Sequence, residues 1–297
     1  MKNEKGIILI IAMIIISSCN IYAMKPKHNT IKHTNVTQSA NKSMEQILKL
    51  AKAYYFGNDS IYMNKQKAFE LFSKAAKQGN LEAQNFLGCC YSTGEGVAKD
   101  IEQAVYWFRK AAEQGFATAQ FNLGLCYQSG DGVEKDFNQA VYWCQKSTEQ
   151  GNATAQYFLA QCYYLGNGVE KDLNQAIYWL RKAAEQEDTA AQCLLGECYL
   201  SGDGVEKDFN QAAYWFRKAA EQEDANAQYL LGVCYDSGNG VEANDTQAFQ
   251  WYFKAAEQGL LKAQKILIIK YEKGVGVKKD KKKAEYWKKK VAEQENK

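Results

Sequence analysis

The apolar positions of this chain repeat with a period of 36 residues. An alanine–glutamine pair begins at Ala83, Ala119, Ala155, Ala191, Ala227 and Ala263. A tryptophan follows at Trp107, Trp143, Trp179, Trp215, Trp251 and Trp287. A less regular copy precedes them, because Tyr55, Phe72 and Gly79 lie in register with Tyr91, Phe108 and Gly115. Self-similarity at this period predicts an array of stacked units over residues 44–297 instead of one globular core.

Each unit is predicted to contain two helices separated by a glycine-marked turn, as in residues 117–130 followed by residues 131–151. The second helix has a start signal, since Asp136 stands three residues before Gln139. The aspartate can accept a bond from the first turn, while the glutamine can reach back to it. The same spacing recurs at Asp100, Asp172 and Asp208. Glycines such as Gly115, Gly151 and Gly259 are predicted to end helices in the left-handed conformation.

The repeated motif LGxCYxSGxGVEKDxxQAxYWxRKAAEQ resembles the Sel1-like repeat, a relative of the tetratricopeptide repeat. The resemblance covers residues 44–297 in seven copies, of which the first is degenerate. It implies an all-α fold, a right-handed α/α superhelical solenoid whose first helices line a concave surface. It also implies a scaffold or adaptor for protein–protein interactions more often than an enzyme.

The first 23 residues have the layout of a secretory signal peptide. Lys2 and Lys5 precede an apolar run that ends near Ile16, which is too short to span a bilayer comfortably. The run leads into a bacterial lipobox-like stretch with Cys19 as the lipid-bearing residue, or into ordinary cleavage after Ala23. We therefore expect an extracytoplasmic protein, either a membrane-anchored lipoprotein or a periplasmic or secreted one.

Residues 24–43 are polar and lack sustained periodicity, which predicts a flexible tether. Both histidines of the chain, His28 and His33, fall in it, and we expect them to be solvated and not metal ligands.

Five of the nine cysteines form a ladder at the repeat spacing: Cys90, Cys126, Cys162, Cys198 and Cys234. Equivalent positions in neighbouring repeats should be about 10 Å apart, beyond the ~7 Å limit for a disulfide. The ladder is therefore predicted to be a row of small buried apolar side chains. Pairing of Cys89, Cys144 and Cys193 stays open.

The net charge of +3 hides a segregation. Residues 44–259 hold 18 basic and 28 acidic side chains, a balance of −10, whereas residues 260–297 hold 13 and 5, a balance of +8. We interpret the basic end as the polar cap that a terminal repeat requires. The alternative is a contact with an anionic lipid, polysaccharide or nucleic acid. No nucleic-acid motif accompanies the charge, so a nucleic-acid partner is not expected.

One face of the first helices differs between copies, and this variation predicts a ligand surface. The differing positions follow i, i+4, i+7 spacing. They are Asn85, Cys89 and Ser92 in one copy and Cys193 in another, together with the predicted binding residues Phe121, Leu125, Gln128, Tyr157, Gln161, Tyr164, Glu197, Leu200, Tyr229, Val233 and Asp236. Aromatic residues at Phe121, Tyr157, Tyr164 and Tyr229 are expected to be exposed anchors for a protein or peptide in the concave groove. The alternatives are neutral drift on a solvated face, or aromatic side chains that pack on the next repeat.

Catalytic patterns are missing from the array. No histidine, GxSxG elbow, HExxH or CxxC motif occurs there, and the glycine-rich turns join helix to helix instead of cradling phosphate or calcium. We predict no catalytic residue, no metal and no cofactor. The resulting hypothesis is an exported, lipid-anchored scaffold of the cell envelope. Its rivals are a secreted effector acting on the proteins of a host or neighbouring cell, and an envelope glycan-binding protein or hydrolase.

Overall fold

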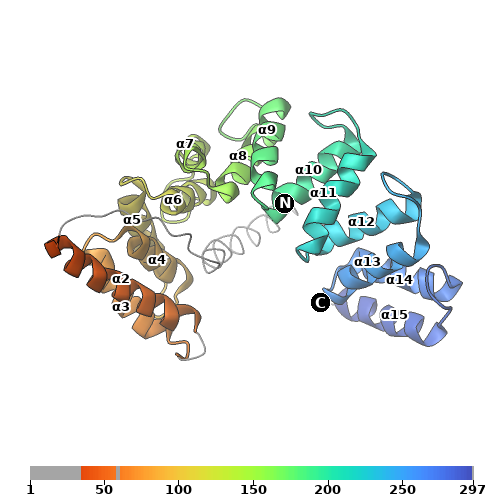
Figure 1. Ribbon diagram of the computed structural model, residues 1–297, viewed down its shortest axis with the longest axis horizontal. Coiled ribbons are helices and arrows are strands. Elements are labelled where there is room, and N and C mark those ends of the chain that lie inside the picture. The colour runs from red at the N-terminus through yellow and green to blue at the C-terminus, as the bar shows by residue number, and fades with distance from the viewer. Residues whose placement is uncertain (1–34, 58–60, 296–297) are drawn as a thin grey trace. The chain divides into compact units, whose positions relative to one another are not determined.

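The computed structural model describes residues 35–57 and 61–295, and this part of the chain forms fourteen helices (Figure 1). The predicted signal peptide, Cys19 and residues 24–34 lie outside the described residues. The first helix, α2 (Asn35–Phe56), includes residues 35–43. This end of the predicted tether is therefore helical, and the predicted boundary at residue 44 lies within a helix.

The helices come in consecutive pairs, one pair for each predicted repeat, so the predicted all-α fold of paired helices is confirmed. The described residues divide into two compact units, one that extends to residue 162 and includes residues 166–170, and one formed by residues 163–165 and 171–295. The first contains α2, α3 (Lys65–Lys77), α4 (Leu81–Thr93), α5 (Ile101–Ala112), α6 (Ala117–Ser129), α7 (Phe137–Glu149) and most of α8 (Ala153–Leu165). The second contains the end of α8, then α9 (Leu173–Glu185), α10 (Thr189–Ser201), α11 (Phe209–Glu221), α12 (Ala225–Ser237), α13 (Asp245–Glu257), α14 (Leu261–Lys273) and α15 (Lys281–Glu295).

The aspartates predicted to start the second helices do so, but the predicted return bond differs. The Asp136 carboxylate accepts from the backbone N–H groups of Asn138 and Gln139. The backbone N–H of Asp136 donates to the carbonyl of Tyr127 at 2.9 Å, in place of the glutamine side chain. Equivalent bonds join Asp100 to Tyr91, Asp172 to Tyr163 and Asp208 to Tyr199. The turn places the end of each first helix beside the start of the second. A carbonyl of the first helix can therefore accept the hydrogen bond of the aspartate's backbone N–H.

The glycine-rich loops are turns that also set the distance between repeats. The first glycine of each ends a helix with positive φ, as Gly238 does at 72°. The second, Gly240, also has φ of 72°, and a Cβ there would lie 1.8 Å from the carbonyl oxygen of Phe209 in the preceding second helix. This position needs glycine for its backbone conformation and for the close approach of two repeats.

The glycines predicted to end second helices are left-handed, but two repeats use glutamate at this place. Gly115, Gly151 and Gly259 have φ between 81° and 90°, whereas Glu187 and Glu223 have φ of 65° and 67°. A left-handed conformation costs a residue with a Cβ about 1–2 kcal/mol. Two sites of local strain therefore lie in the second unit.

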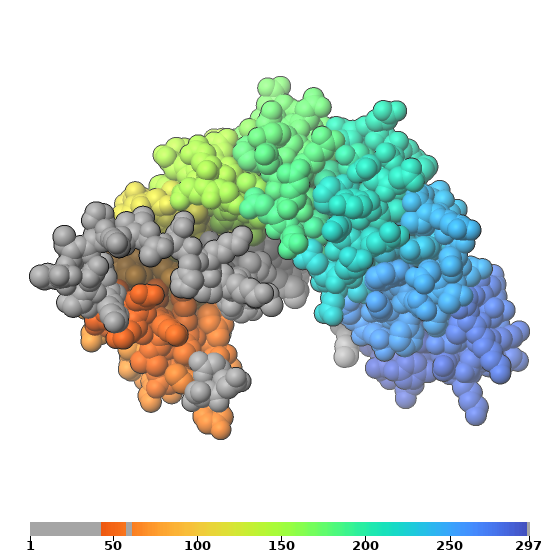
Figure 2. Space-filling view, in the orientation of Figure 1, coloured from red at the N-terminus to blue at the C-terminus, as the bar shows by residue number. Residues whose placement is uncertain are grey.

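The core of each unit is built from small side chains between larger apolar ones. Figure 2 shows the helix pairs following one another in chain order within each unit. The cysteine ladder is buried as predicted, and Cys126, Cys162, Cys198 and Cys234 are free thiols. Burial raises the pKa of Cys126 and Cys162 to about 12 and that of Cys198 and Cys234 to about 11. These thiols are protonated packing groups and not nucleophiles.

The glutamine of each alanine–glutamine pair is a buried connector between repeats. The Gln192 side-chain nitrogen donates to the carbonyl of Ala184 at 3.1 Å, and its oxygen accepts from Gln222 at 2.9 Å. Gln228 makes the same two bonds, to Ala220 and from Gln258. The exposed Gln222 and Gln258 thus satisfy the buried side-chain oxygens of Gln192 and Gln228.

Candidate binding surface

The predicted ligand surface is best formed in the second unit, on the first helices α10, α12 and α14. Leu200, Tyr229 and Val233 are half-buried there, and Glu197 is exposed. Ile269 lies one repeat beyond Val233 and is 45% exposed. Ile269 was not among the predicted binding residues, although it lies 36 residues after Val233.

The polar members of this surface have partners within the unit. The Tyr164 hydroxyl donates to Asp203 at 3.0 Å, and this bond is the main reason that the pKa of Tyr164 is raised. Partial burial, followed by the charge of Asp224, raises the pKa of Glu197, while Lys262 opposes the shift. The fold therefore holds the Tyr164 side chain in place through its hydrogen bond to Asp203.

Asp236, a predicted binding residue, is the centre of a polar cluster. Lys270, only 5% exposed, places its ammonium 2.5 Å from one Asp236 oxygen and 3.6 Å from Asp245. The Tyr252 hydroxyl lies 3.4 Å from the other Asp236 oxygen. Burial, followed by the Asp236 charge, raises the pKa of Tyr252 above its usual range. Asp236 thus joins two repeats, a role that the sequence analysis did not predict.

Lys270 occupies the next place in the cysteine ladder, 36 residues after Cys234. The ladder was predicted only as far as its cysteines extend. The 36-residue spacing, extended one step beyond Cys234, could have identified Lys270 as a cation inside the array.

In the first unit, the predicted exposure is wrong for Phe121 and Leu125, each of which is 1% exposed. The Phe121 ring packs edge-on against Phe158 at 6.3 Å between centroids. Residues 118–126 of α6 are all buried, so this helix has no solvated face in its middle. Helical periodicity separates two faces of a helix, but it reveals exposure only when one face meets water.

The other predicted residues of the first unit lie between these extremes. Gln128, Tyr157 and Gln161 are half-buried, and the Gln161 amide donates to the Tyr157 hydroxyl at 2.9 Å. Asn85, at the equivalent of Phe121, is buried and accepts from the Asn122 amide at 2.8 Å. The stripe therefore includes a buried hydrogen bond that links α4 to α6.

No metal site or membrane-spanning helix is found in the described residues. Nowhere in residues 35–57 and 61–295 do three His, Cys, Asp or Glu side chains gather as metal ligands would. No helix in those ranges is both long and apolar enough to cross a bilayer.

The family model of the Sel1 repeat matches the chain seven times, at residues 47–80, 81–116, 117–152, 153–188, 189–224, 225–260 and 271–296. The chain belongs to the Sel1 repeat family. Each complete match coincides with one helix pair, and members of this family generally mediate protein–protein interactions on a fold that is generally a non-catalytic scaffold. The last match begins at residue 271, so most of α14 departs from the Sel1 repeat pattern.

Two solved Sel1 repeat structures are similar in sequence as well as fold. A protective antigen of uropathogenic Escherichia coli strains with an SLR fold is 36% identical, with a TM-score of 0.76. The match covers 89% of this chain, which spans 57% of that one. A Sel1 repeat protein from Oxalobacter formigenes is 35% identical over 84% of this chain and 96% of its own, with a TM-score of 0.71. A comparison with the curated proteins found no match.

The second helices of the Sel1 repeats carry an aromatic surface that the sequence analysis overlooked. Its members are the exposed tyrosines Tyr106, Tyr142, Tyr178, Tyr214 and Tyr286, each edge-on to the tryptophan that follows it. A lysine four residues later lies within 6 Å of each ring centroid, as Lys110 does for Tyr106. The recurring Tyr–Trp pair was visible in the sequence, but its identical copies gave no sign of which ring was exposed.

Proposed function

We propose that this Sel1 repeat protein is an exported, lipid-anchored scaffold that binds another protein through the face of its first helices. The observation that carries the binding proposal is the partly exposed apolar row in the second unit, formed by Leu200, Tyr229, Val233 and Ile269. The buried parts of Leu200, Tyr229 and Val233 pack against the apolar cores of the unit. Their remaining surface and the 45% exposed Ile269 are not needed for that packing. Such a row is typical of a surface that a partner covers.

The charged neighbours of this row favour a partner with mixed charge. Glu197 is exposed beside Leu200, and Lys262 lies close enough to lower its pKa. Asp236 is engaged by Lys270, so its carboxylate is only partly available to a ligand. The apolar row would then supply affinity and the charges at its edge would supply orientation.

The proposed export and anchor rest on the amino-terminal sequence, with Cys19 as the acylated residue. Intact-mass measurement of protein isolated from membranes tests this part. A diacyl or triacyl mass on Cys19 is the expected result. Protein that begins at Met24 without lipid would replace the anchor by ordinary cleavage, and an unprocessed chain would overturn export.

A crosslinked pull-down from native envelopes tests the binding part. The triple variant Leu200→Gln, Val233→Gln and Ile269→Gln removes the apolar row with residues that keep helical propensity. The control variant, Tyr178→Gln with Tyr214→Gln, removes exposed rings from the second helices of the same unit. We expect the partner to be lost with the triple variant and retained with the control; loss with neither, at unchanged circular dichroism, would refute the proposed surface.

A further inference from the structure

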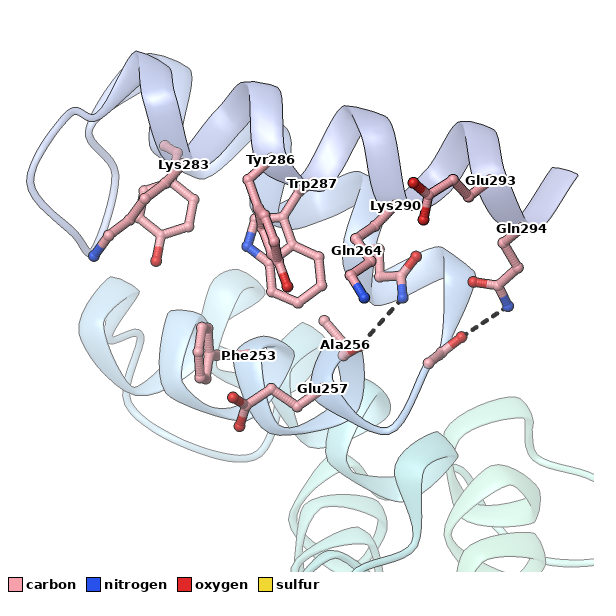
Figure 3. A pocket seen from close by; sticks show the side chains of 12 residues that line it. Phe253, Ala256, Glu257, Gln264, Lys283, Tyr286, Trp287, Lys290, Glu293 and Gln294 are labelled. Carbon is pink, nitrogen blue, oxygen red and sulfur yellow. Dashed lines mark hydrogen bonds between the residues drawn. The ribbon is translucent and has the colours of Figure 1, made fainter.

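A cleft at the end of the second unit differs from the other repeat interfaces. It lies between α13 and α15, with α14 behind it, and has a volume of about 730 Å³ (Figure 3). This volume is within the range of ligand sites, roughly 300–1,000 Å³. Tyr286 and Trp287 project from α15 towards Phe253 on α13. These three residues and Tyr271 on α14 form the aromatic part of the lining.

Substitution of one repeated residue makes this cleft aromatic. At three interior interfaces an arginine on the second helix, such as Arg217, donates to a tyrosine hydroxyl on the next helix, such as Tyr235, at 3.0 Å. The other two pairs are Arg109 with Tyr127 and Arg181 with Tyr199. Phe253 occupies the arginine position in the last complete interface, and its ring meets Trp287 edge-on at 6.1 Å and 87°. A contact between two aromatic rings is thus present in the repeat that lacks the arginine–tyrosine hydrogen bond.

Each cation of the cleft lies near a lining ring: the Lys283 ammonium is 5.5 Å from the Tyr271 centroid, and that of Lys290 is 5.8 Å from the Tyr286 centroid. Lys283 stands where the preceding five copies have glutamine, as Gln247 does one repeat earlier. Among the described residues no carboxylate forms an ion pair with Lys283 or Lys290, whereas the neighbouring Lys288 is paired with Glu272 and Glu285. Glu257 and Glu293 also line the cleft, so it is not uniformly basic. The surrounding segment, residues 260–297, nevertheless has a balance of +8.

We propose that this cleft binds an acidic peptide segment of a partner protein, with one large aromatic or apolar side chain inserted between Phe253 and Tyr286. Carboxylates beside that anchor are held by Lys283 and Lys290, and Glu257 and Glu293 accept hydrogen bonds from the peptide's backbone. Trp287 is only 6% exposed, whereas Tyr286 is 55% exposed and offers one open ring face that a sugar could use. Lys283 and Lys290, which have no carboxylate partner among the described residues, favour the acidic peptide over a glycan. The site is separate from the apolar row on the first helices, so either proposal can fail without the other.

The sequence supplies variants that separate the cleft from general charge. Phe253→Gln installs the residue that Gln145 provides in an earlier repeat, and it removes the aromatic wall without adding charge. Lys283→Gln installs the glutamine of the preceding copies. The control is Lys282→Asn, which imports the asparagine found at Asn210 and removes the same charge from a residue that does not line the cleft.

Fluorescence anisotropy of labelled octapeptides measures the binding. The first probe contains one tryptophan, one leucine and six glutamates; a second has glutamine for glutamate, and a third has alanine for tryptophan and leucine. We expect saturable binding of the first probe only, weakened about tenfold or more by Phe253→Gln and by Lys283→Gln and less than about twofold by Lys282→Asn.

Three results would overturn the proposal. One is the absence of saturable binding by the first probe. The second is equal binding of the first and third probes, or equal weakening by Lys282→Asn and Lys283→Gln, since either would mean attraction to a basic surface alone. The third is preferential binding of anionic vesicles or glycan fragments that Phe253→Gln abolishes, which would assign the cleft another occupant. Thermal melting monitored by circular dichroism verifies that each variant is folded.

Discussion

The interior interfaces of the array and its last interface join the same helices with different chemistry. Between interior repeats, a buried thiol such as Cys234 fills the ladder position, and an arginine such as Arg217 bridges to a tyrosine. In the last repeat Lys270 fills the ladder position and Phe253 replaces the arginine. The helix pairing is unchanged, because glycine turns and small alanines set the approach of the backbones. The side chains between them are free to change, and at the end of the array they do.

The strongest way to break either kind of interface is to add a Cβ at the second glycine of a turn. Gly240→Ala and Gly276→Ala should each cost about 3 kcal/mol or more, because φ is positive and the new atom would lie 1.8–2.0 Å from a carbonyl oxygen. Gly259→Ala is the matched control, since it has positive φ but no neighbour within 4 Å. Urea unfolding measures the differences. Equal costs at the three sites would mean that the close approach is unimportant.

Removal of the buried cation should loosen the last interface selectively. Lys270→Ala leaves Asp236 and Asp245 without their partner and opens a void, at a cost of about 2 kcal/mol, moderated because both carboxylates are partly exposed. Lys270→Cys, which extends the thiol ladder, should recover part of this loss. Hydrogen exchange in α14 and α15 localises the effect. If exchange in α10 rises as much as in α14, the cluster does not act on the last interface alone.

Asp188, the N-cap of α10, should make one interior interface dependent on pH. Burial raises its pKa from 3.8 to about 6, so the folded state binds the proton more tightly than the unfolded chain and folding is less favourable above pH 6. Asp188→Asn keeps a cap that Asn152 already provides at the equivalent place. It should stabilise the protein by about 2 kcal/mol at pH 7.

The gain from Asp188→Asn should shrink as the pH falls from 6 towards 4, because the wild-type carboxyl is then protonated in the folded state. Urea unfolding of both proteins at pH 4, 5, 6 and 7 follows the difference. A gain that is constant with pH would assign the effect to capping geometry and not to the buried charge.

The smallest expected effect concerns the two glutamates in left-handed conformation. Glu223→Gly restores the residue of the other repeats and should stabilise the second unit by about 1 kcal/mol, because the native φ of 67° strains a side chain but not glycine. Lys218→Gly, at an exposed position inside α11, should destabilise by a similar amount, since glycine weakens a helix interior. Opposite signs in thermal unfolding are the test; a loss with both variants would refute the strain.

The candidate site was predicted less completely than the fold. The positions of its stripe follow from helical spacing, and Leu200, Tyr229 and Val233 lie on a partly exposed face. Phe121 and Leu125 are buried instead, because the middle of α6 is covered on every side. Helical periodicity identifies the two faces of a helix, but it does not show whether a second neighbour covers the outer face. Asp236 pairs with Lys270, which is 34 residues later in the chain. Lys270 could be recognised from the sequence only by extending the 36-residue spacing of the cysteine ladder one step beyond Cys234.

The sequence by itself determined the number of repeats, the pairing of helices, the aspartate caps and the burial of the thiols, because these depend on local propensity and on a period repeated without a gap. Only the tertiary structure decided which aromatic rings meet solvent, where the N-cap amides of the second helices bond, and how Phe253 opens a cleft. Those outcomes depend on contacts between successive repeats, where one substitution changes the environment of residues a full period away.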